Sequence, residues 1–146
     1  MSRLYHELAG EYHLMYQEIF DYRADFEKHR EIFSSHGCRR ILEIGCGSGS
    51  LGRLFSESGF SYTGTDVSAE MIELAERLNP GVDFIRSDMR ELSEVSAAGS
   101  FDAVFSCGRS FTYMTTNRDV LDCLGAVNRL LKEDGILVFD NFLASR

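Results

Sequence analysis

The sequence lacks the features that mark membrane-inserted and secreted chains. Its 146 residues contain no apolar run near the roughly 20 residues that cross a bilayer, and its amino-terminal end has no apolar signal-peptide core. It has one proline, and 44% of its residues are hydrophobic, which is enough to bury a substantial core in one domain. We therefore expect a cytoplasmic protein with no membrane contact.

Basic residues are scarce, and the cysteines show no pairing pattern. Lysine and arginine number 15 against 23 aspartates and glutamates, which gives a formal net charge of -8. Nucleic-acid binding normally depends on a basic surface, so this balance argues against DNA or RNA as the partner. The four cysteines form no C-x-x-C pair and have no zinc-site spacing. We expect reduced thiols, with neither a metal site nor a disulfide framework.

What the sequence does contain is a strand that runs into a glycine-rich turn. An apolar stretch that starts at Ile41 is followed by Gly45, Gly47 and Gly49 in alternation. Glycine lets the backbone bend and approach a ligand closely, because no Cβ stands in the way. Residues 50–58 then have the amphipathic pattern of a helix. Together these features predict a nucleotide-binding loop.

The spacing of the glycines distinguishes between two kinds of nucleotide site. The dinucleotide-binding fingerprint would require glycine at position 50, where this chain has serine. With Glu43 in front, the string E-I-G-C-G-S-G resembles the first motif of the class I S-adenosylmethionine-dependent methyltransferases. The resemblance implies S-adenosyl-L-methionine as cofactor and S-adenosyl-L-homocysteine as its product. It also implies that Glu43 orients the loop or binds the methionine ammonium group, and that Cys46 contributes only its backbone.

A second motif follows the next predicted strand, residues 60–65. Asp66 lies about 20 residues beyond the glycine turn, where a carboxylate can accept hydrogen bonds from ribose hydroxyls. In the resembled family this position holds the adenosyl ribose. Val67 and Met71 are included in the expected cofactor site. Ser68 is expected to cap a helix whose buried face consists of Met71, Ile72, Leu74, Ala75 and Leu78.

Two further strand ends carry residues that the resemblance predicts. A strand over residues 82–87 precedes Asp88 and Met89, where the family has an acid near the adenine amino group and an apolar neighbour against the ring. A strand over residues 101–105 precedes Ser106, which opens the loop that runs under the methionine part of the cofactor in this family. Asp88, Met89 and Ser106 therefore complete the expected cofactor site.

Alternating strands and helices predict an α/β fold with a parallel sheet. A helix over residues 117–132, with Val120, Leu124, Val127 and Leu131 on one face, and a fifth strand over residues 135–140 complete the pattern. The resemblance implies a Rossmann-like, doubly wound, mostly parallel sheet of strand order 3-2-1-4-5. Strands six and seven of that family are missing here, which leaves the edge of strand five open. Truncation, completion by a partner, or a homodimer through that edge would explain this, and we favour truncation.

The amino-terminal region is expected to form a helical cap, residues 1–40, on a cofactor-binding domain, residues 41–146. The cap's apolar stripe, Ile19, Tyr22, Phe26 and Phe33, should lie against the sheet. The segment from Tyr5 to His13 resembles the Y-x-x-L-A-x-x-Y-D segment that closes over the cofactor in small-molecule methyltransferases, with His13 in place of the aspartate.

Methyl transfer from a sulfonium is an in-line displacement, so the enzyme mainly aligns donor and acceptor in a dry pocket. Tyr12, His13 and Tyr16 are the candidate catalytic residues, and His6 is a further candidate base.

The loop after strand four lacks the N/D-P-P-Y/F string with which amide and exocyclic-amine methylases hold a planar nitrogen. Arg109 in this loop is a candidate partner for a carboxylate or phosphate, and Phe111 and Tyr113 are expected in the core or the channel wall. We predict methyl transfer to a small-molecule nitrogen or oxygen acceptor. Two alternatives remain open. One is a non-catalytic S-adenosyl-ligand-binding domain that needs a partner or the missing C-terminal part, and the other is an NAD-dependent oxidoreductase.

Overall fold

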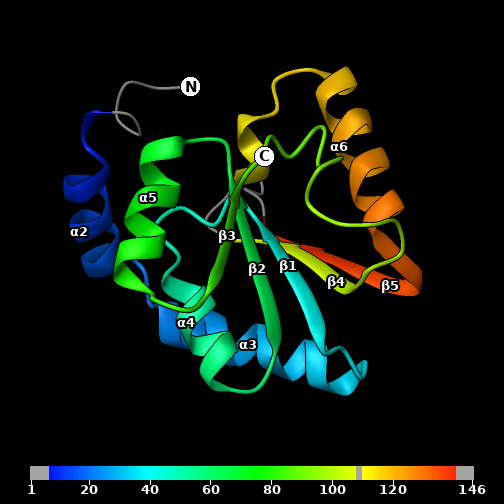
Figure 1. Ribbon diagram of the computed structural model, residues 1–146, viewed down its shortest axis with the longest axis horizontal. Helices are drawn as coiled ribbons and strands as arrows, with labels where there is room; N and C mark the ends of the chain where they lie inside the picture. The colour runs from blue at the N-terminus through cyan, green and yellow to red at the C-terminus, as the bar shows by residue number, and fades with distance from the viewer. Residues whose placement is uncertain (1–6, 108–109, 141–146) are drawn as a thin grey trace, which may run out of the picture.

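The computed structural model describes residues 7–107 and 110–140, which form an α/β fold around one five-stranded sheet (Figure 1). All neighbouring strands are parallel, and their order β3-β2-β1-β4-β5 confirms the predicted topology. Because the strands run in one direction, their carboxyl ends meet at one edge of the sheet. The strands are β1 (Arg40–Ile44), β2 (Ser61–Asp66), β3 (Asp83–Arg86), β4 (Phe101–Ser106) and β5 (Leu131–Phe139).

Two of the helices on the sheet begin at a capping side chain. Ser68 and Thr116 each accept a hydrogen bond from the backbone N–H three residues later, which satisfies a donor that the first helical turn leaves free. No helix in the described ranges is long and apolar enough to cross a membrane. The helices are α2 (Ala9–Ile19), α3 (Tyr22–Ser35), α4 (Ser50–Glu57), α5 (Ala69–Leu78) and α6 (Asn117–Leu130), with a 3-10 turn η1 (Ser110–Tyr113).

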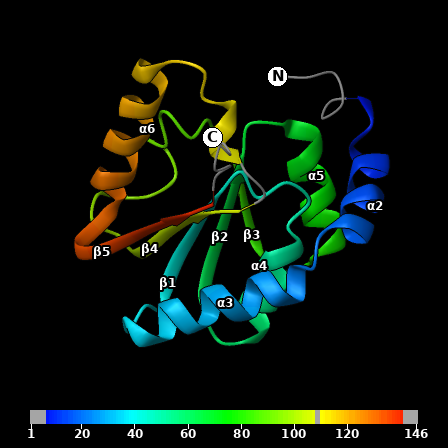
Figure 2. The ribbon, with the colours of Figure 1, turned by 180° about the vertical axis from the view of Figure 1, so that it is seen from behind.

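The sheet has a separate hydrophobic cluster on each face, because successive side chains of a strand point in opposite directions. On one face α3, α4 and α5 pack around three fully buried rings, Phe33, Phe55 and Phe105, whose centroids lie 5.2 to 5.7 Å apart. On the other face α6 packs against β1 and β4. Figure 2 shows α3 and α6 from the opposite side. The residues of α6 in this second cluster are Cys123, Ala126, Val127 and Leu130.

The prediction for the last helix and strand was wrong at their boundary. Helix α6 ends at Leu130, and β5 starts at once at Leu131 instead of Gly135. The strand pairs with β4 twice, at Phe101↔Leu131 and again from Ala103↔Ile136, and the extra residues between these points bulge out of the ladder. The predicted turn at residues 133–135 is this bulge within one strand.

Three apolar residues expected to be buried are exposed. Leu124 is 39% exposed because α6 presents the neighbouring small residues Cys123 and Ala126 to the sheet. Leu78 is 40% exposed at the end of α5, and Ile19 is 64% exposed. Ile19 belongs to α2, which buries no residue and lies beside α5 at the far end of the molecule from α6 (Figure 1, Figure 2). Within the expected cap stripe, Phe26 and Phe33 of α3 do reach the core.

Candidate functional site

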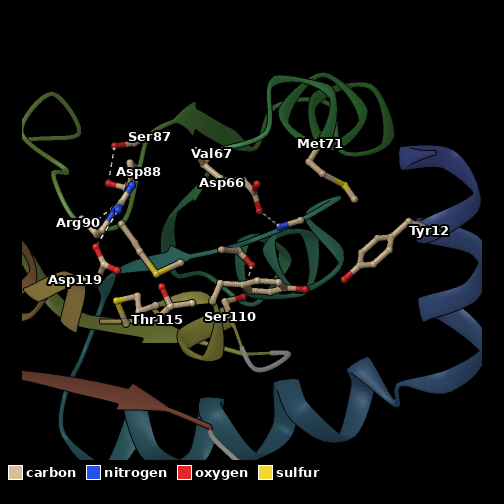
Figure 3. A pocket seen from close by; sticks show the side chains of 15 residues that line it. Tyr12, Asp66, Val67, Met71, Ser87, Asp88, Arg90, Ser110, Thr115 and Asp119 are labelled. Carbon is tan, nitrogen blue, oxygen red and sulfur yellow. Dashed lines mark hydrogen bonds and ion pairs between the residues drawn. The ribbon is translucent and has the colours of Figure 1, made fainter. Parts of the chain in front are cut away.

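A cavity of about 360 Å³ opens at the carboxyl edge of the sheet, where ligands bind in open parallel α/β folds (Figure 3). Its wall combines the glycine turn after β1, the ends of β2 and β3, and residues of α2, α5, η1 and α6. The predicted cofactor residues that line it are Gly45, Gly47, Asp66, Val67, Met71, Asp88 and Met89.

The three glycines after β1 serve different purposes, although all have positive φ angles, between +55° and +78°. A Cβ on Gly45 would overlap the side chain of Ser110, and a Cβ on Gly49 would come within 2.5 Å of the Phe84 ring. A Cβ on Gly47 would meet no protein atom within 4 Å. Gly45 and Gly49 are therefore required by packing as well as by backbone angle, whereas Gly47 leaves open space beside the cavity.

Asp66, at the end of β2, holds the glycine turn in place. Its carboxylate accepts hydrogen bonds from the backbone N–H groups of Gly47, at 3.0 Å, and Ser68, at 2.9 Å. Figure 3 shows the side chain directed at the glycine turn beside the cavity. Burial raises the pKa of Asp66, although the backbone N–H donors act in the opposite direction. The carboxylate thus joins the ends of β1 and β2 and remains on the cavity wall.

Four of the predicted cofactor residues do not line the cavity. Glu43 is buried within the sheet, where Tyr62 donates a hydrogen bond to Oε1 at 3.3 Å, and burial raises its pKa well above the ordinary value. Cys46 packs in the core under α3 and α4, and Gly49 lies at the N-cap of α4. Ser106 is fully buried at the end of β4. Glu43 Oε2 and Ser106 Oγ have no hydrogen-bond partner in residues 7–107 and 110–140.

Of the three candidate catalytic residues, only Tyr12 lines the cavity. Burial and a hydrogen bond with Tyr16 raise the pKa of Tyr12, so its hydroxyl stays protonated at neutral pH. The ring of Tyr16 lies between those of Tyr12 and Phe20, at centroid distances of 4.0 and 4.8 Å. The side chain of His13 points towards the glycine turn, where its Nδ1 lies 2.6 Å from Ser48 Oγ, and burial lowers the pKa of His13. Tyr5, His6 and Arg109 lie outside the described residues.

The structure adds cavity residues that the sequence reasoning missed or left open between core and channel wall. Tyr113 is in the wall and 58% exposed, whereas Phe111 is in the core and stacks on Phe139 at 4.5 Å. Arg90 directly follows the Asp88-Met89 motif, and this position in the sequence is the one signal that could have indicated that Arg90 belongs to the site. The added residues are Ser87, Arg90, Ser110, Tyr113, Met114, Thr115 and Asp119.

Arg90 is the centre of an ion-pair cluster on this wall. It pairs with Asp88, two residues earlier in the loop after β3, and with Asp119 in the first turn of α6. Hydrogen bonds from Arg90 are the largest cause of the lowered pKa of both carboxyls. Both acids therefore carry their negative charge at neutral pH.

Comparison with known proteins identifies the family. A family model described as a methyltransferase domain matches residues 41–135. The chain is 39% identical over 104 residues to the putative methyltransferase YqeM of Bacillus subtilis, covering 69% of this chain and 41% of that protein. It is 30% identical over 133 residues to a glycine/sarcosine N-methyltransferase of Aphanothece halophytica, covering 86% of this chain and 50% of that protein. The chain thus spans about half the length of these curated relatives.

A solved structure agrees with these sequence matches. The sugar N-methyltransferase KedS8 from a Streptoalloteichus species superposes with a TM-score of 0.79 at 26% identity, over 90% of this chain and 53% of that one. The family model covers more than half of the chain, and the fold is shared by solved methyltransferases. The chain therefore belongs to the family of S-adenosylmethionine-dependent methyltransferase domains.

Proposed function

We propose that the chain binds S-adenosylmethionine in the cavity and takes part in methyl transfer to a small-molecule nitrogen or oxygen acceptor. The observation that supports this most directly is the convergence of the glycine turn, Asp66 and Asp88 on one cavity. These groups lie in separate parts of the sequence, and each follows a different parallel strand. Their meeting at the carboxyl edge is what a nucleotide ligand requires in this type of sheet.

The residues present fit this cofactor. Gly47 leaves open space in which a ligand can approach the backbone, and Asp66 offers a carboxylate to ribose hydroxyls. Asp88 and Met89 offer an acceptor and an apolar surface to the adenine ring. When bound, S-adenosylmethionine supplies an electrophilic methyl group on a positively charged sulfur. The chain's own task is to hold that group in line with the acceptor and to exclude water.

The described wall of the cavity favours a neutral or cationic acceptor, such as an amine, over an anionic one. Asp66 and Asp88 on this wall are assigned to the cofactor, and the guanidinium of Arg90 is already paired with Asp88 and Asp119. The described wall therefore offers no further cation to an anionic acceptor. Because Tyr12 remains protonated, we propose that its hydroxyl contacts the acceptor and does not act as the base. A nitrogen acceptor also agrees with the names of the Aphanothece and KedS8 relatives.

Calorimetric titration of the chain with S-adenosylhomocysteine, with NADH as the control ligand, tests the cofactor assignment. We expect binding of the first ligand alone. Incubation with S-adenosylmethionine and a panel of small amines and alcohols, followed by mass spectrometry, then tests transfer. Binding without any methylated product would favour the non-catalytic domain, and binding of NADH alone would favour an oxidoreductase.

A further inference from the structure

One side chain, Arg90, joins two walls of the cavity that come from distant parts of the sequence. Its Nη2 lies 2.7 Å from Asp88 Oδ2, and its Nη1 lies 2.9 Å from Asp119 Oδ1. Figure 3 shows the guanidinium between the two carboxylates. Asp88 belongs to the loop after β3 and Asp119 to the start of α6, so the Arg90 head group is fixed from both sides. Two-sided pairing of this kind gives arginine a defined orientation.

Arg90 uses most of the hydrogen-bonding capacity of Asp88. Oδ1 accepts from the backbone N–H of Arg90 at 2.9 Å and from its Nε at 3.0 Å, and Oδ2 accepts from Nη2 at 2.7 Å. A carboxylate has about four lone-pair sites, two on each oxygen. The hydrogen bonds of the described residues therefore leave one acceptor site, on Oδ2, and the bound guanidinium fixes its direction.

We propose that Arg90 is a positioning residue for ligand selection, and that it presents the remaining acceptor site of Asp88 to an exocyclic amino group on a purine ring. The inference rests on the proposed S-adenosyl cofactor. An ionised carboxylate only accepts hydrogen bonds, so a ring with oxygen in place of the amino group would bring two acceptors together. The Arg90–Asp88 pair thereby distinguishes a 6-aminopurine ligand from a 6-oxopurine one.

The exposure of the ion pair indicates that removing Arg90 should leave the fold intact. The side chains of Arg90 and Asp88 are 49% and 31% exposed. Ion pairs this accessible contribute little to folding stability. The loss of the Arg90 side chain should therefore act on ligand selection, because the Asp88 carboxylate then keeps only the hydrogen bond from the backbone N–H of residue 90 and is less firmly oriented.

The test compares the affinities of S-adenosylhomocysteine and S-inosylhomocysteine, whose purine carries oxygen instead of the amino group, by calorimetry. We expect the unaltered chain to prefer the adenosyl ligand by about tenfold or more, since two acceptors facing each other in place of a charged hydrogen bond cost about this much. Arg90→Ala should reduce the preference at least threefold. Arg90→Lys, which keeps the charge but loses the bidentate contact, should reduce it as well. Arg118→Ala is the matched control, because Arg118 forms an exposed pair with Asp122 on α6.

The outcomes separate this inference from the proposed function. If the unaltered chain binds neither ligand, the cofactor assignment itself is wrong. If it binds both equally, or if the preference is the same in Arg90→Ala and Arg90→Lys as in the unaltered chain, the role of Arg90 is refuted while the cofactor stands. A preference that rises in Arg90→Ala would show that Arg90 contacts the purine itself, which also contradicts the inference. If Arg90 had a purely structural role, Arg90→Ala would weaken the binding of both ligands by the same factor, and the preference would not change.

Discussion

Replacing Gly47 by alanine adds one methyl group to the wall of the cavity and provides a direct test of the cofactor site. An added Cβ at this position meets no protein atom within 4 Å, so the folded chain has room for it. Gly47 also lines the cavity. The methyl group should therefore obstruct a ligand that needs to approach the backbone, without disturbing the core. Equivalent changes at Gly45 or Gly49 would be less informative, because the new Cβ would collide with Ser110 or Phe84.

The size of the effect has two parts, one on folding and one on binding. The φ angle of Gly47 is +55°, and a side chain in the left-handed region costs about 1 kcal/mol of folding free energy. For a chain of this size that loss lowers the melting temperature by roughly 2 to 4 °C. A methyl group forced into a packed contact costs about 1 to 3 kcal/mol. The dissociation constant of S-adenosylhomocysteine should therefore rise by about 5- to 150-fold.

Gly37→Ala is the matched control, because Gly37 has a similar φ of +68° and equally open surroundings but does not line the cavity. Both variants should show a similar loss of melting temperature, measured by circular dichroism. Only Gly47→Ala should lose affinity for S-adenosylhomocysteine in calorimetry. Equal affinity of the two folded variants for this ligand would refute the assignment of the glycine turn to cofactor contact.

Three further predictions concern the carboxyl groups of Asp66 and Glu43. Asp66→Ala should weaken S-adenosylhomocysteine binding by about 1 to 3 kcal/mol in calorimetry, because ribose hydroxyls lose a charged acceptor, and unchanged affinity would rule out the ribose contact. Because burial raises the pKa of Asp66, its carboxylate becomes protonated at a higher pH than an ordinary aspartate does, and the affinity for S-adenosylhomocysteine should start to fall at that higher pH. In Asp66→Asn, calorimetry over a pH series should show no such fall. Burial also raises the folded-state pKa of Glu43, so its contribution to stability is present below its unfolded pKa and is lost as the pH rises towards the folded value. Urea unfolding at several pH values should show that loss in the unaltered chain but not in Glu43→Gln, and parallel curves would contradict it.

The fold was predictable because its determinants are local. Apolar strands, amphipathic helices, the capping residue Ser68 and the glycines after β1 each act within a few residues along the chain. The resemblance then supplied the strand order, which the structure confirms. In a parallel sheet the residues that follow consecutive strands meet at one edge. For this reason Asp66 and Asp88, recognised by position alone, were placed on the same cavity.

The boundary of β5 and the direction of side chains around the site were not predictable in this way. The motif left open whether Glu43 orients the loop or binds the methionine ammonium group, and only the structure shows that its side chain is buried in the sheet and contacts Tyr62. Leu131 starts a strand because β4 lies beside it, not because of the residues that precede it.

The sequence by itself thus determined the order of elements, the glycine turn and the acids at the strand ends, since each depends on neighbouring residues. Tertiary structure alone decided which other groups face the ligand space. Asp119 reaches Arg90 from 29 residues away, and Ser110 donates to the carbonyl of Gly45 across the end of the sheet. Contacts of this kind depend on how α6 and η1 pack over the sheet, and side-chain packing between distant segments leaves no periodic pattern in the chain.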